Sequence, residues 1–314
     1  MASVVFFGSP DFALPTLEVL IRSEYRPILV VTQPDRPSGR GLSATPTPVH
    51  QTARDAGIEV RTAAGLKDGA VADYLESLKP DFLVVVAFGM ILPERILRIP
   101  RLECVNVHAS LLPAYRGASP INAAVANGDS FTGVSTIRMT ERLDAGPVFM
   151  QEVEPIDPME DAGTLSERLA VKGASLLLAT LRGVEDGGLS PVEQPGEGVS
   201  RAPLLTKRDG LIPWEKPAVE VHNHVRGMNP WPGSHSYIRG RYVKIHRTRP
   251  ASVMPAAGAP GEVIRAAGEE ILVACGAGIV RIERLQVEGK KPLEAGDFLR
   301  GFEIGAGERF GGIE

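Results

Sequence analysis

Short apolar runs alternate with amphipathic segments over the first 180 or so residues of the chain. The segments with helical spacing lie at 48–56, 68–78 and in a long stretch that ends near 182. The apolar runs, rich in β-branched and aromatic residues, predict buried strands at 4–7, 28–32, 82–88, 104–109 and 134–139. Strands that alternate with helices indicate an α/β protein with a Rossmann-like open sheet.

Turn and capping residues predict where several of these helices begin and end. Ser9 and Pro10 follow the first apolar run directly, so Ser9 is expected to cap a helix whose first position is Pro10. Thr164 and Glu167 have the spacing of a capping box, which predicts the start of the long helix. Gly57 is expected to end the helix over 48–56.

The pattern changes in the last third of the chain. A segment rich in glycine, proline and acidic residues at 183–198 has the composition of a linker. Short β-like runs follow it at 237–246, 262–264, 271–274 and 279–285. Such runs, separated by glycines, predict a small C-terminal β-barrel or sandwich. We therefore expect domains at 1–189 and 207–314, joined by a linker at 190–206.

Composition narrows the class of protein. With 314 residues, 43% hydrophobic and 23% charged, the chain resembles ordinary globular proteins and not disordered ones. Its two cysteines are far apart in sequence, which excludes a disulfide framework or a four-cysteine zinc site. Its apolar runs are too short to span a bilayer, and its first residues lack the basic segment of a signal peptide. We expect a cytoplasmic protein with no membrane partner.

Charge is distributed unevenly along the chain. Residues 1–200 contain 17 Lys and Arg against 25 Asp and Glu, whereas residues 201–314 contain 17 against 13. The window 221–261 contains six Lys or Arg residues and no acidic residue. Because neutralised phosphates release counterions, this pattern favours a polyanionic partner. A solvated basic face with no partner would give the same pattern.

Several common sites are absent from the sequence. The first strand is followed by a single glycine, Gly8, where a dinucleotide-binding turn needs three, and Gly39 and Gly41 lack the third glycine too. A lysine-containing phosphate loop is also missing. His222 and His224 could suggest a metal pair, but a third ligand with suitable spacing is not evident, so we interpret them as surface histidines and expect no metal.

Asn106 and His108 form the most informative pair of polar residues. On a strand, residues two apart point to the same face, here at the end of the fourth predicted strand. Ligands of open α/β sheets bind beyond such strand ends. An amide that donates to a developing oxyanion, beside an imidazole that moves a proton, suits carbonyl chemistry. A polar pair of this kind is more often purely structural, however.

The stretch from Asn106 to Pro113, continued to residue 121, resembles the signature of the folate-dependent formyltransferases. The chain is most similar to the members that act on methionyl-tRNA. The resemblance extends nearly from end to end. The matching segments are 7–12, 32–37, 85–93, 106–121, 143–146 and 229–232.

The resemblance implies transfer of the formyl group of 10-formyltetrahydrofolate to the α-amino group of methionyl-initiator tRNA. The family's catalytic residues fall on Asn106, His108 and Asp144. The sequence around Asp144 is also typical of a turn, so this residue could have a purely structural role. Asn106 would hold the formyl oxygen, His108 would stabilise the same charge or move a proton, and Asp144 would orient His108 or accept the amine's proton. The residues implied in binding the tetrahydrofolate derivative are Ser110, Leu111, Leu112, Pro113, Phe88, Gly89, Met90, Ile91 and Leu92.

By the same resemblance, the C-terminal domain is an OB-like barrel that binds tRNA. The loop 33–46 would insert into the acceptor arm, although Leu42, Ser43 and Ala44 stand where lysines are expected. The family also implies a monomer. The cations expected to contact tRNA are Arg36, Arg40, Arg239, Arg241, Lys244 and Arg247.

Related activities remain as alternatives at this stage. A nucleotide-sugar formyltransferase would use a sugar amine, a glycinamide ribonucleotide formyltransferase would lack the tRNA loop, and a formyltetrahydrofolate hydrolase would use water. A non-catalytic RNA-binding protein on the same scaffold would be expected to have lost one of Asn106, His108 or Asp144, and all three are present.

Overall fold

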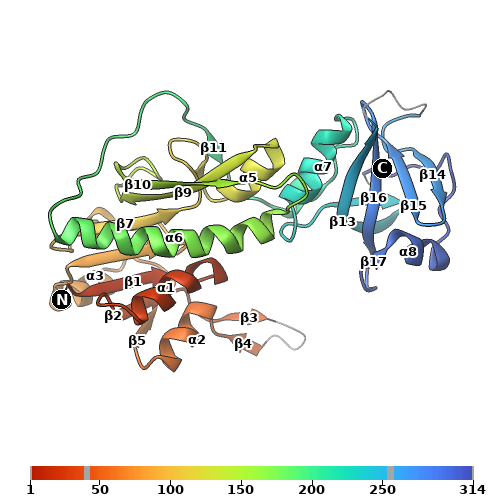
Figure 1. Cartoon of the computed structure of the whole chain (residues 1–314). Helices are drawn as coiled ribbons and strands as arrows, with labels where there is room; N and C mark the ends of the chain where they lie inside the picture. Colours follow the sequence, from red (N-terminus) through yellow and green to blue (C-terminus); the bar gives the residue numbers. More distant parts are fainter. Residues whose placement is uncertain (1, 39–42, 253–257, 313–314) are drawn as a thin grey trace. The chain divides into compact units, whose positions relative to one another are not determined.

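The computed structural model describes residues 2–38, 43–252 and 258–312, and the chain divides into two compact units (Figure 1). The second unit contains two short segments from within the first two hundred residues, and the chain enters its main part at Pro203. The first unit comprises Met1–Pro120, Thr132–Glu154 and Ser166–Ala202, and the second comprises Ile121–Phe131, Pro155–Leu165 and Pro203–Glu314. Every helix in the described residues is too short or too polar to cross a lipid bilayer.

A seven-stranded sheet forms the centre of the first unit. Five neighbouring strands are parallel, and β9 then pairs antiparallel with β7. In spatial order the strands are β10 (Val148–Pro155), β9 (Phe131–Arg138), β7 (Glu103–His108), β6 (Phe82–Val86), β1 (Val4–Gly8), β2 (Pro27–Thr32) and β5 (Glu59–Thr62). The predicted α/β class with a Rossmann-like sheet is confirmed.

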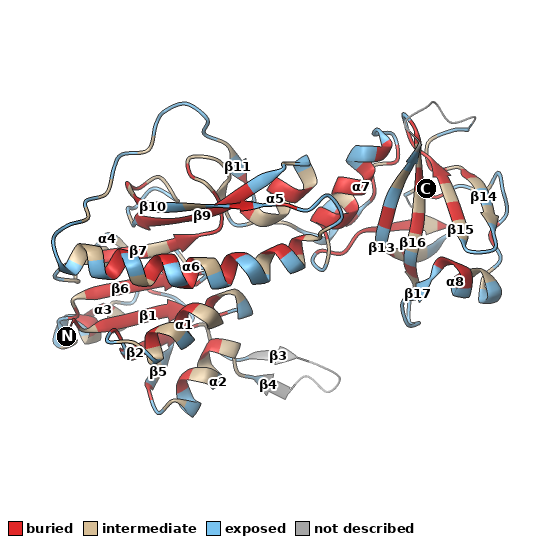
Figure 2. Ribbon diagram, in the orientation of Figure 1, coloured by how far each residue is buried: buried red, intermediate tan, exposed pale blue. Residues whose placement is uncertain are grey.

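Side chains of β1 alternate between the two faces of this sheet. Phe6 packs on the face covered by α1, α2 and α6, where it joins Leu177 of α6. Phe7 packs on the opposite face, where it joins Leu75 of α3. Both phenylalanines are fully buried, and β1 is coloured as buried in Figure 2. The helices are α1 (Leu14–Ile21), α2 (Pro48–Asp55), α3 (Ala70–Leu78), α4 (Glu94–Leu97) and α6 (Ala162–Glu185).

Two predicted helix starts were wrong. A 3₁₀ turn, η1 (Asp11–Ala13), begins after Pro10, and the Ser9 hydroxyl accepts a hydrogen bond from the backbone N–H of Gln33 at 3.2 Å instead of capping it. Helix α6 begins at Ala162, earlier than predicted, so the cap falls on Asp161. The Asp161 carboxylate accepts hydrogen bonds from the backbone N–H and hydroxyl of Thr164, both at 2.9 Å.

Two short strand pairs lie outside the main sheet. Within the loop 33–46, β3 (Arg36–Ser38) pairs antiparallel with β4 (Ser43–Thr45). Strand β8 (Arg116–Gly117) pairs in parallel with β11 (Arg201–Ala202). The second pair joins the loop after β7 to a segment that the sequence assigns to the linker.

The second unit contains an antiparallel sheet in the order β12, β13, β16, β15 and β14, with β17 beside β16. The terminal segment bonds to both edges of this sheet, because Gly311 pairs with Tyr237 of β12 and Glu308 accepts from the N–H of Val263 in β14 at 2.7 Å. These bonds close the sheet into a barrel. The elements are β12 (His235–Ile238), β13 (Arg241–Ser252), β14 (Val263–Ala267), β15 (Glu270–Ala274), β16 (Ile279–Val287), β17 (Leu293–Glu294), α5 (Pro120–Asn127), η2 (Lys207–Gly210), α7 (Ala218–Gly227) and α8 (Ala295–Gly301).

Candidate active site

Strand β7 presents Asn106 and His108 on one face at its carboxyl end. Val105 and Val107, which alternate with them, pack in the core beneath α6, so the two polar side chains point to the opposite face. Asn106 is partly exposed, and its side-chain amide makes no hydrogen bond to any described residue. Its two N–H donors are therefore available to an incoming oxygen atom.

Both ring nitrogens of His108 face oxygen atoms of the protein. Nε2 lies 3.0 Å from the backbone carbonyl oxygen of Tyr115, which can only accept, so Nε2 carries a hydrogen. Nδ1 lies 3.6 Å from Oδ1 of Asp144, and the side chains of His108 and Asp144 are only 6% and 11% exposed. The imidazole is thus fixed in orientation, with Nδ1 directed at a carboxylate.

Asp144 is held from its other side by the loop after β7. Its Oδ2 accepts a hydrogen bond from the backbone N–H of Gly117 at 2.9 Å. Asp144 has a positive φ of 48°, which is uncommon for a residue other than glycine. The structure thus brings His108 and Asp144 together, from a strand end and from the turn before β10.

The loop at 110–113, expected to contact the folate, is held by polar side chains of two neighbouring strands, the buried Ser135 and the exposed Gln151. Ser135 of β9 donates from its hydroxyl to the Ser110 carbonyl at 2.6 Å and accepts from the Leu112 N–H at 3.1 Å. Gln151 of β10 donates to the Leu112 carbonyl at 2.9 Å. Because these partners come from two strands of the sheet, the loop with Leu111 and Pro113 is a rigid edge of the site.

Residues 88–92 divide between the core and the surface. Phe88 and Leu92 are each 2% exposed and belong to the core, where Phe88 meets Phe7 edge to face with ring centroids 5.2 Å apart. Ile91 is 73% exposed and Met90 is half-buried. At Gly89, with φ of 77°, an added Cβ would lie 2.6 Å from Nε2 of Gln33. The side chains of Met90 and Ile91, together with bare backbone at Gly89, are therefore what this segment can offer a ligand.

Gln194 and Ser200, which no sequence pattern indicated, hold the loops of the candidate site. Ser200 accepts from the Tyr115 N–H at 2.8 Å through its hydroxyl and from the Arg116 N–H at 2.9 Å through its carbonyl. Gln194 donates to the carbonyl oxygens of Asp144 at 2.8 Å and Gly146 at 2.7 Å. Both residues lie in the predicted linker at 190–206, whose composition gave no signal for either role.

Two of the predicted tRNA-binding cations of the barrel, Arg239 and Arg247, have acidic partners that lie outside the acid-free window. Arg239 pairs with Glu308, with Nε and Oε2 2.6 Å apart, and this contact lowers the pKa of Glu308. Arg247 binds Glu283 at 2.9 Å and Glu294 at 2.8 Å. Acidic residues of β16, β17 and the terminal segment therefore neutralise part of the positive charge of residues 221–261 in the folded protein.

Arg241 and Lys244 make no ion pair within the described parts of the chain. Arg241 lies over the ring of Phe302, 5.6 Å from its centroid. Lys244 shares the outer face of β13 with Tyr242, because the alternating Val243 is buried. Of the other predicted tRNA contacts, Arg36 begins β3 and Arg40 lies outside the described residues.

The interpretation of His222 as a surface residue was wrong, whereas His224 is partly exposed. His222 is 6% exposed, its Nδ1 lies 3.2 Å from the Thr248 hydroxyl, and its Nε2 lies 3.0 Å from the Pro158 carbonyl. Burial lowers the pKa of both histidines. Helix α7 turns one face into the core of the second unit, and the pattern of the two histidines alone did not indicate that face.

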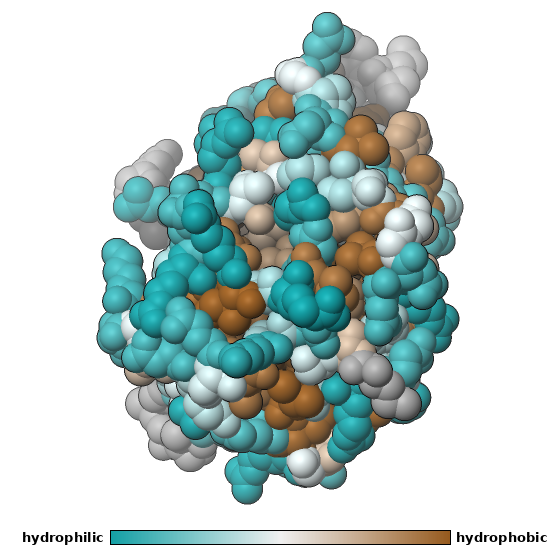
Figure 3. Space-filling view, turned by 90° about the vertical axis from the view of Figure 1, so that its left-hand side faces the viewer, coloured by the Kyte–Doolittle hydropathy of each residue, from teal (hydrophilic) through white to brown (hydrophobic). Residues whose placement is uncertain are grey.

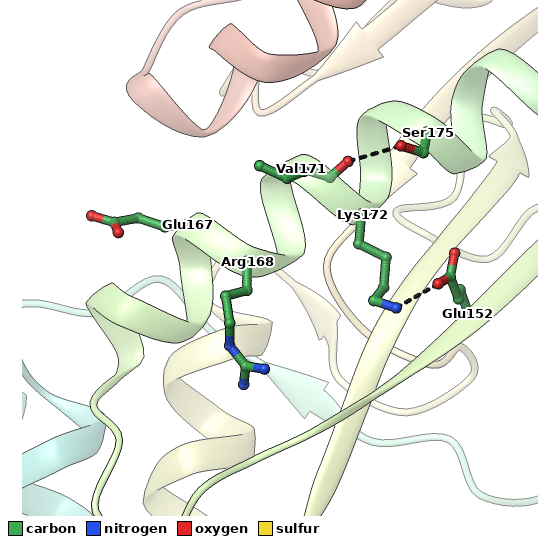
Figure 4. Close-up of a pocket in the computed structure, with 6 residues that line it drawn as sticks. All are labelled: Glu152, Glu167, Arg168, Val171, Lys172 and Ser175. Atoms are coloured by element: carbon green, nitrogen blue, oxygen red, sulfur yellow. Dashed lines mark hydrogen bonds and ion pairs between the residues drawn. The ribbon is translucent and has the colours of Figure 1, made fainter.

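An open groove of about 530 Å³ lies elsewhere on the first unit, along α6 (Figure 4). Its two cations are paired, since Lys172 binds Glu152 and Glu154 and Arg168 binds Glu154. It contains none of the candidate site residues. On the face shown in Figure 3, hydrophobic side chains form small patches among hydrophilic ones, as is ordinary for a protein surface.

Two family profiles match successive parts of the chain. The profile of the formyl transferase family matches residues 1–181, and that of the formyl transferase C-terminal domain matches residues 204–303. The chain is 46% identical to methionyl-tRNA formyltransferase of Pelobacter propionicus over 99% of this chain and 96% of that protein. It is also 46% identical to the enzyme of the same name from Geotalea uraniireducens, with 98% and 97% covered.

Solved structures of lower identity share the fold. The N-formyltransferase of Helicobacter canadensis, solved with folinic acid and dTDP-3-aminofucose, superposes with a TM-score of 0.68 at 17% identity. The match covers 90% of this chain and 99% of that one. Matches to both family profiles, together with the two close relatives, establish that the chain belongs to the formyl transferase family.

Proposed function

We propose that this protein transfers the formyl group of 10-formyltetrahydrofolate to the α-amino group of methionyl-initiator tRNA. The observation that carries this proposal is the 46% identity, over nearly the whole chain, to enzymes named methionyl-tRNA formyltransferase. The sugar-modifying relative shares only the fold at 17% identity. The arrangement of Asn106, His108 and Asp144 supports the chemistry.

In the proposed reaction, the amine nitrogen attacks the formyl carbon and a new C–N bond forms while negative charge develops on the formyl oxygen. Asn106 donates a hydrogen bond to that oxygen, a contribution typically worth about 3 kcal/mol of barrier lowering. Its amide is suited to this role because described protein groups leave its donors unused.

Asp144 and His108 accept and transfer the proton that the attacking amine loses. Asp144 accepts the proton that the attacking amine loses, and His108 Nδ1, 3.6 Å from Asp144 Oδ1, provides the next position for it. The bond between the formyl carbon and the folate nitrogen then breaks as that nitrogen receives, from the Asp144–His108 pair, the proton that the amine released, so no net proton is gained or lost. Because both His108 nitrogens face protein oxygens, we assign the direct contact with the formyl oxygen to Asn106.

The folate would lie between the rigid loop 110–113 and the segment 88–92. A flat pterin ring needs apolar contact and a few fixed polar groups. Met90 and Ile91 offer the apolar contact, and the fixed backbone of Ser110 to Pro113 offers the polar groups. We expect Phe88 and Leu92 to act indirectly, by supporting this surface from the core.

The tRNA would bind the barrel face that carries Arg241 and Lys244, together with the loop that holds Arg36 and Arg40. Beside Lys244, the rings of His235 and Tyr242 stack with centroids 4.9 Å apart. Cations beside aromatic rings on a barrel suit nucleic acid, since phosphates pair with the former and bases stack on the latter. We further propose that the protein acts as a cytoplasmic monomer.

The deciding experiment offers the formyl donor four acceptors in parallel: methionyl-initiator tRNA, methionyl-elongator tRNA, a nucleotide-linked amino sugar and water. We expect rapid transfer to the initiator tRNA alone, and a loss of about 100-fold or more in Asn106→Ala. His108→Ala should also lose activity. Transfer to the sugar or to water would reject the proposed acceptor, and no transfer at all would reject the catalytic assignment.

A further inference from the structure

The turn that carries Asp144 depends on a residue outside the catalytic trio. Asp144 has a positive φ, which is unfavourable for a residue other than glycine and persists only when surrounding groups hold it. The Gly117 N–H fixes its carboxylate, but fixing the backbone needs a partner for the carbonyl groups of the turn. The side chain of Gln194 is that partner.

We propose that Gln194 is a positioning residue that sets the geometry of the His108–Asp144 pair. Its Nε2 donates both hydrogens, to the carbonyl oxygens of Asp144 at 2.8 Å and Gly146 at 2.7 Å. Its Oε1 accepts from Arg116, at 3.1 Å from Nε and 2.7 Å from Nη2. One amide therefore ties the turn of Asp144 to the loop after β7.

That loop holds the other half of the pair. Arg116 follows Tyr115, whose carbonyl receives the Nε2 hydrogen of His108, and precedes Gly117, whose N–H binds Asp144. A shift of the loop relative to the turn would change the separation between Nδ1 and Oδ1. Misplacement of a catalytic group by about 1 Å costs on the order of 100-fold in rate.

The chemistry of the side chain is specific. Two donors and an acceptor in one plane are a property of amides, whereas glutamate cannot donate when ionised and methionine has no comparable polar group. Asparagine is one methylene shorter. Gln194→Met should therefore break both connections, and Gln194→Glu should retain the contact with Arg116 but lose the one with the turn.

The test rests on the proposed function and measures formyl transfer to methionyl-initiator tRNA with both variants. We expect kcat to fall about 10- to 100-fold in each, with KM for tRNA and for the folate donor unchanged, because substrate contacts remain. The matched control is Glu197→Gln, an exposed position in the same segment, which should retain full kcat. Thermal unfolding reports whether Gln194→Met folds, and Gln194→Glu provides a second variant if it does not.

A double substitution separates positioning from general support. If Gln194 acts through Asp144, adding Gln194→Glu to Asp144→Asn should cause little further loss, whereas independent effects would multiply. Unchanged kcat in Gln194→Glu, or fully multiplicative losses, would overturn the inference. Absence of transfer by the unmodified protein would instead reject the proposed function.

Discussion

The catalytic loops and the basic barrel face both depend on residues distant in sequence, but with opposite consequences. The catalytic loops are the loop after β7 and the turn of Asp144, which the proposed reaction uses, and the basic barrel face comprises the cations of 239–247. At the catalytic loops, Gln194 and Ser200 supply hydrogen bonds that the local sequence lacks. At the barrel face, Glu283 and Glu308 neutralise cations that the local sequence presents as free. Distant residues complete the hydrogen bonding of the catalytic loops, whereas they reduce the net positive charge of the barrel face. A stretch of sequence rich in cations is therefore weaker evidence for a binding surface than a pair of polar residues at a strand end.

The largest expected effect tests the support of the catalytic loops. Gly117 has φ of 127°, and an added Cβ would lie 2.3 Å from the carbonyl oxygen of Ala202. Gly117→Ala must therefore separate β8 from β11 and move the N–H that binds Asp144. We expect a loss of about 100-fold in kcat and a lower melting temperature, measured by formyl transfer and by thermal unfolding.

Gly187→Ala provides the matched control for that variant. Gly187 also has a positive φ, 70°, but an added Cβ would meet no described atom within 4 Å. Its alanine variant should lose about 1–2 kcal/mol of unfolding free energy from backbone strain and keep full kcat. Equal activity in Gly117→Ala and Gly187→Ala would show that the β8–β11 contact does not support the site.

A second, intermediate effect tests the barrel face. Both substitutions in the pair Lys244→Ala and Arg247→Ala remove one positive charge, but Arg247 already has two acidic partners. We expect Lys244→Ala to weaken tRNA binding and reduce its salt slope by about one, and Arg247→Ala to change both less. The measurement is the dissociation constant over a range of salt concentrations. A larger effect of Arg247→Ala would show that its acidic partners give way to phosphate.

The smallest effect concerns protonation on the same face. Burial lowers the pKa of His246, and nearby Arg284 and Lys244 lower it further. His246 therefore gains its charge only below pH 6.5, where it would add a cation beside Lys244. Because protonation then favours the unfolded state, its contribution to stability is present above pH 6.5 and is lost as the pH falls.

We accordingly expect the affinity for tRNA to rise modestly as the pH falls from 7.5 to 5.5. The rise is small because one added positive charge releases at most one further counterion from the tRNA. The rise should be smaller in His246→Gln. Equal pH dependence in both proteins would assign the titration to a different group.

Much of the first unit could be predicted from local patterns. The apolar runs of the sequence predicted the positions of its strands, because parallel strands that are covered on both faces are continuously apolar, as β6 is. Asn106 and His108 could be placed together because alternation along a strand is a local rule. Asp144 came from resemblance alone, since its position depends on a turn with positive φ that no periodicity indicates.

The remaining features depend on the tertiary structure. Gln194 has its role because the segment around it returns to the catalytic loops, where Val192 pairs with Val148, and its composition is that of a flexible linker. His222 is buried because Thr248 and Pro158, both distant in sequence, meet its ring. Such partners are set by which segments the fold brings together, and one sequence does not specify them.

The pairing of β11 with β8 has a consequence for exchanging parts between relatives. A chimaera or truncation cut at residue 189, the end of the first domain expected from the sequence, would separate Gln194 and Ser200 from the loops that they hold. A cut after Ala202, where the first compact unit ends, keeps both. Recombination that changes the acceptor while keeping the chemistry should therefore succeed at the second junction and fail at the first.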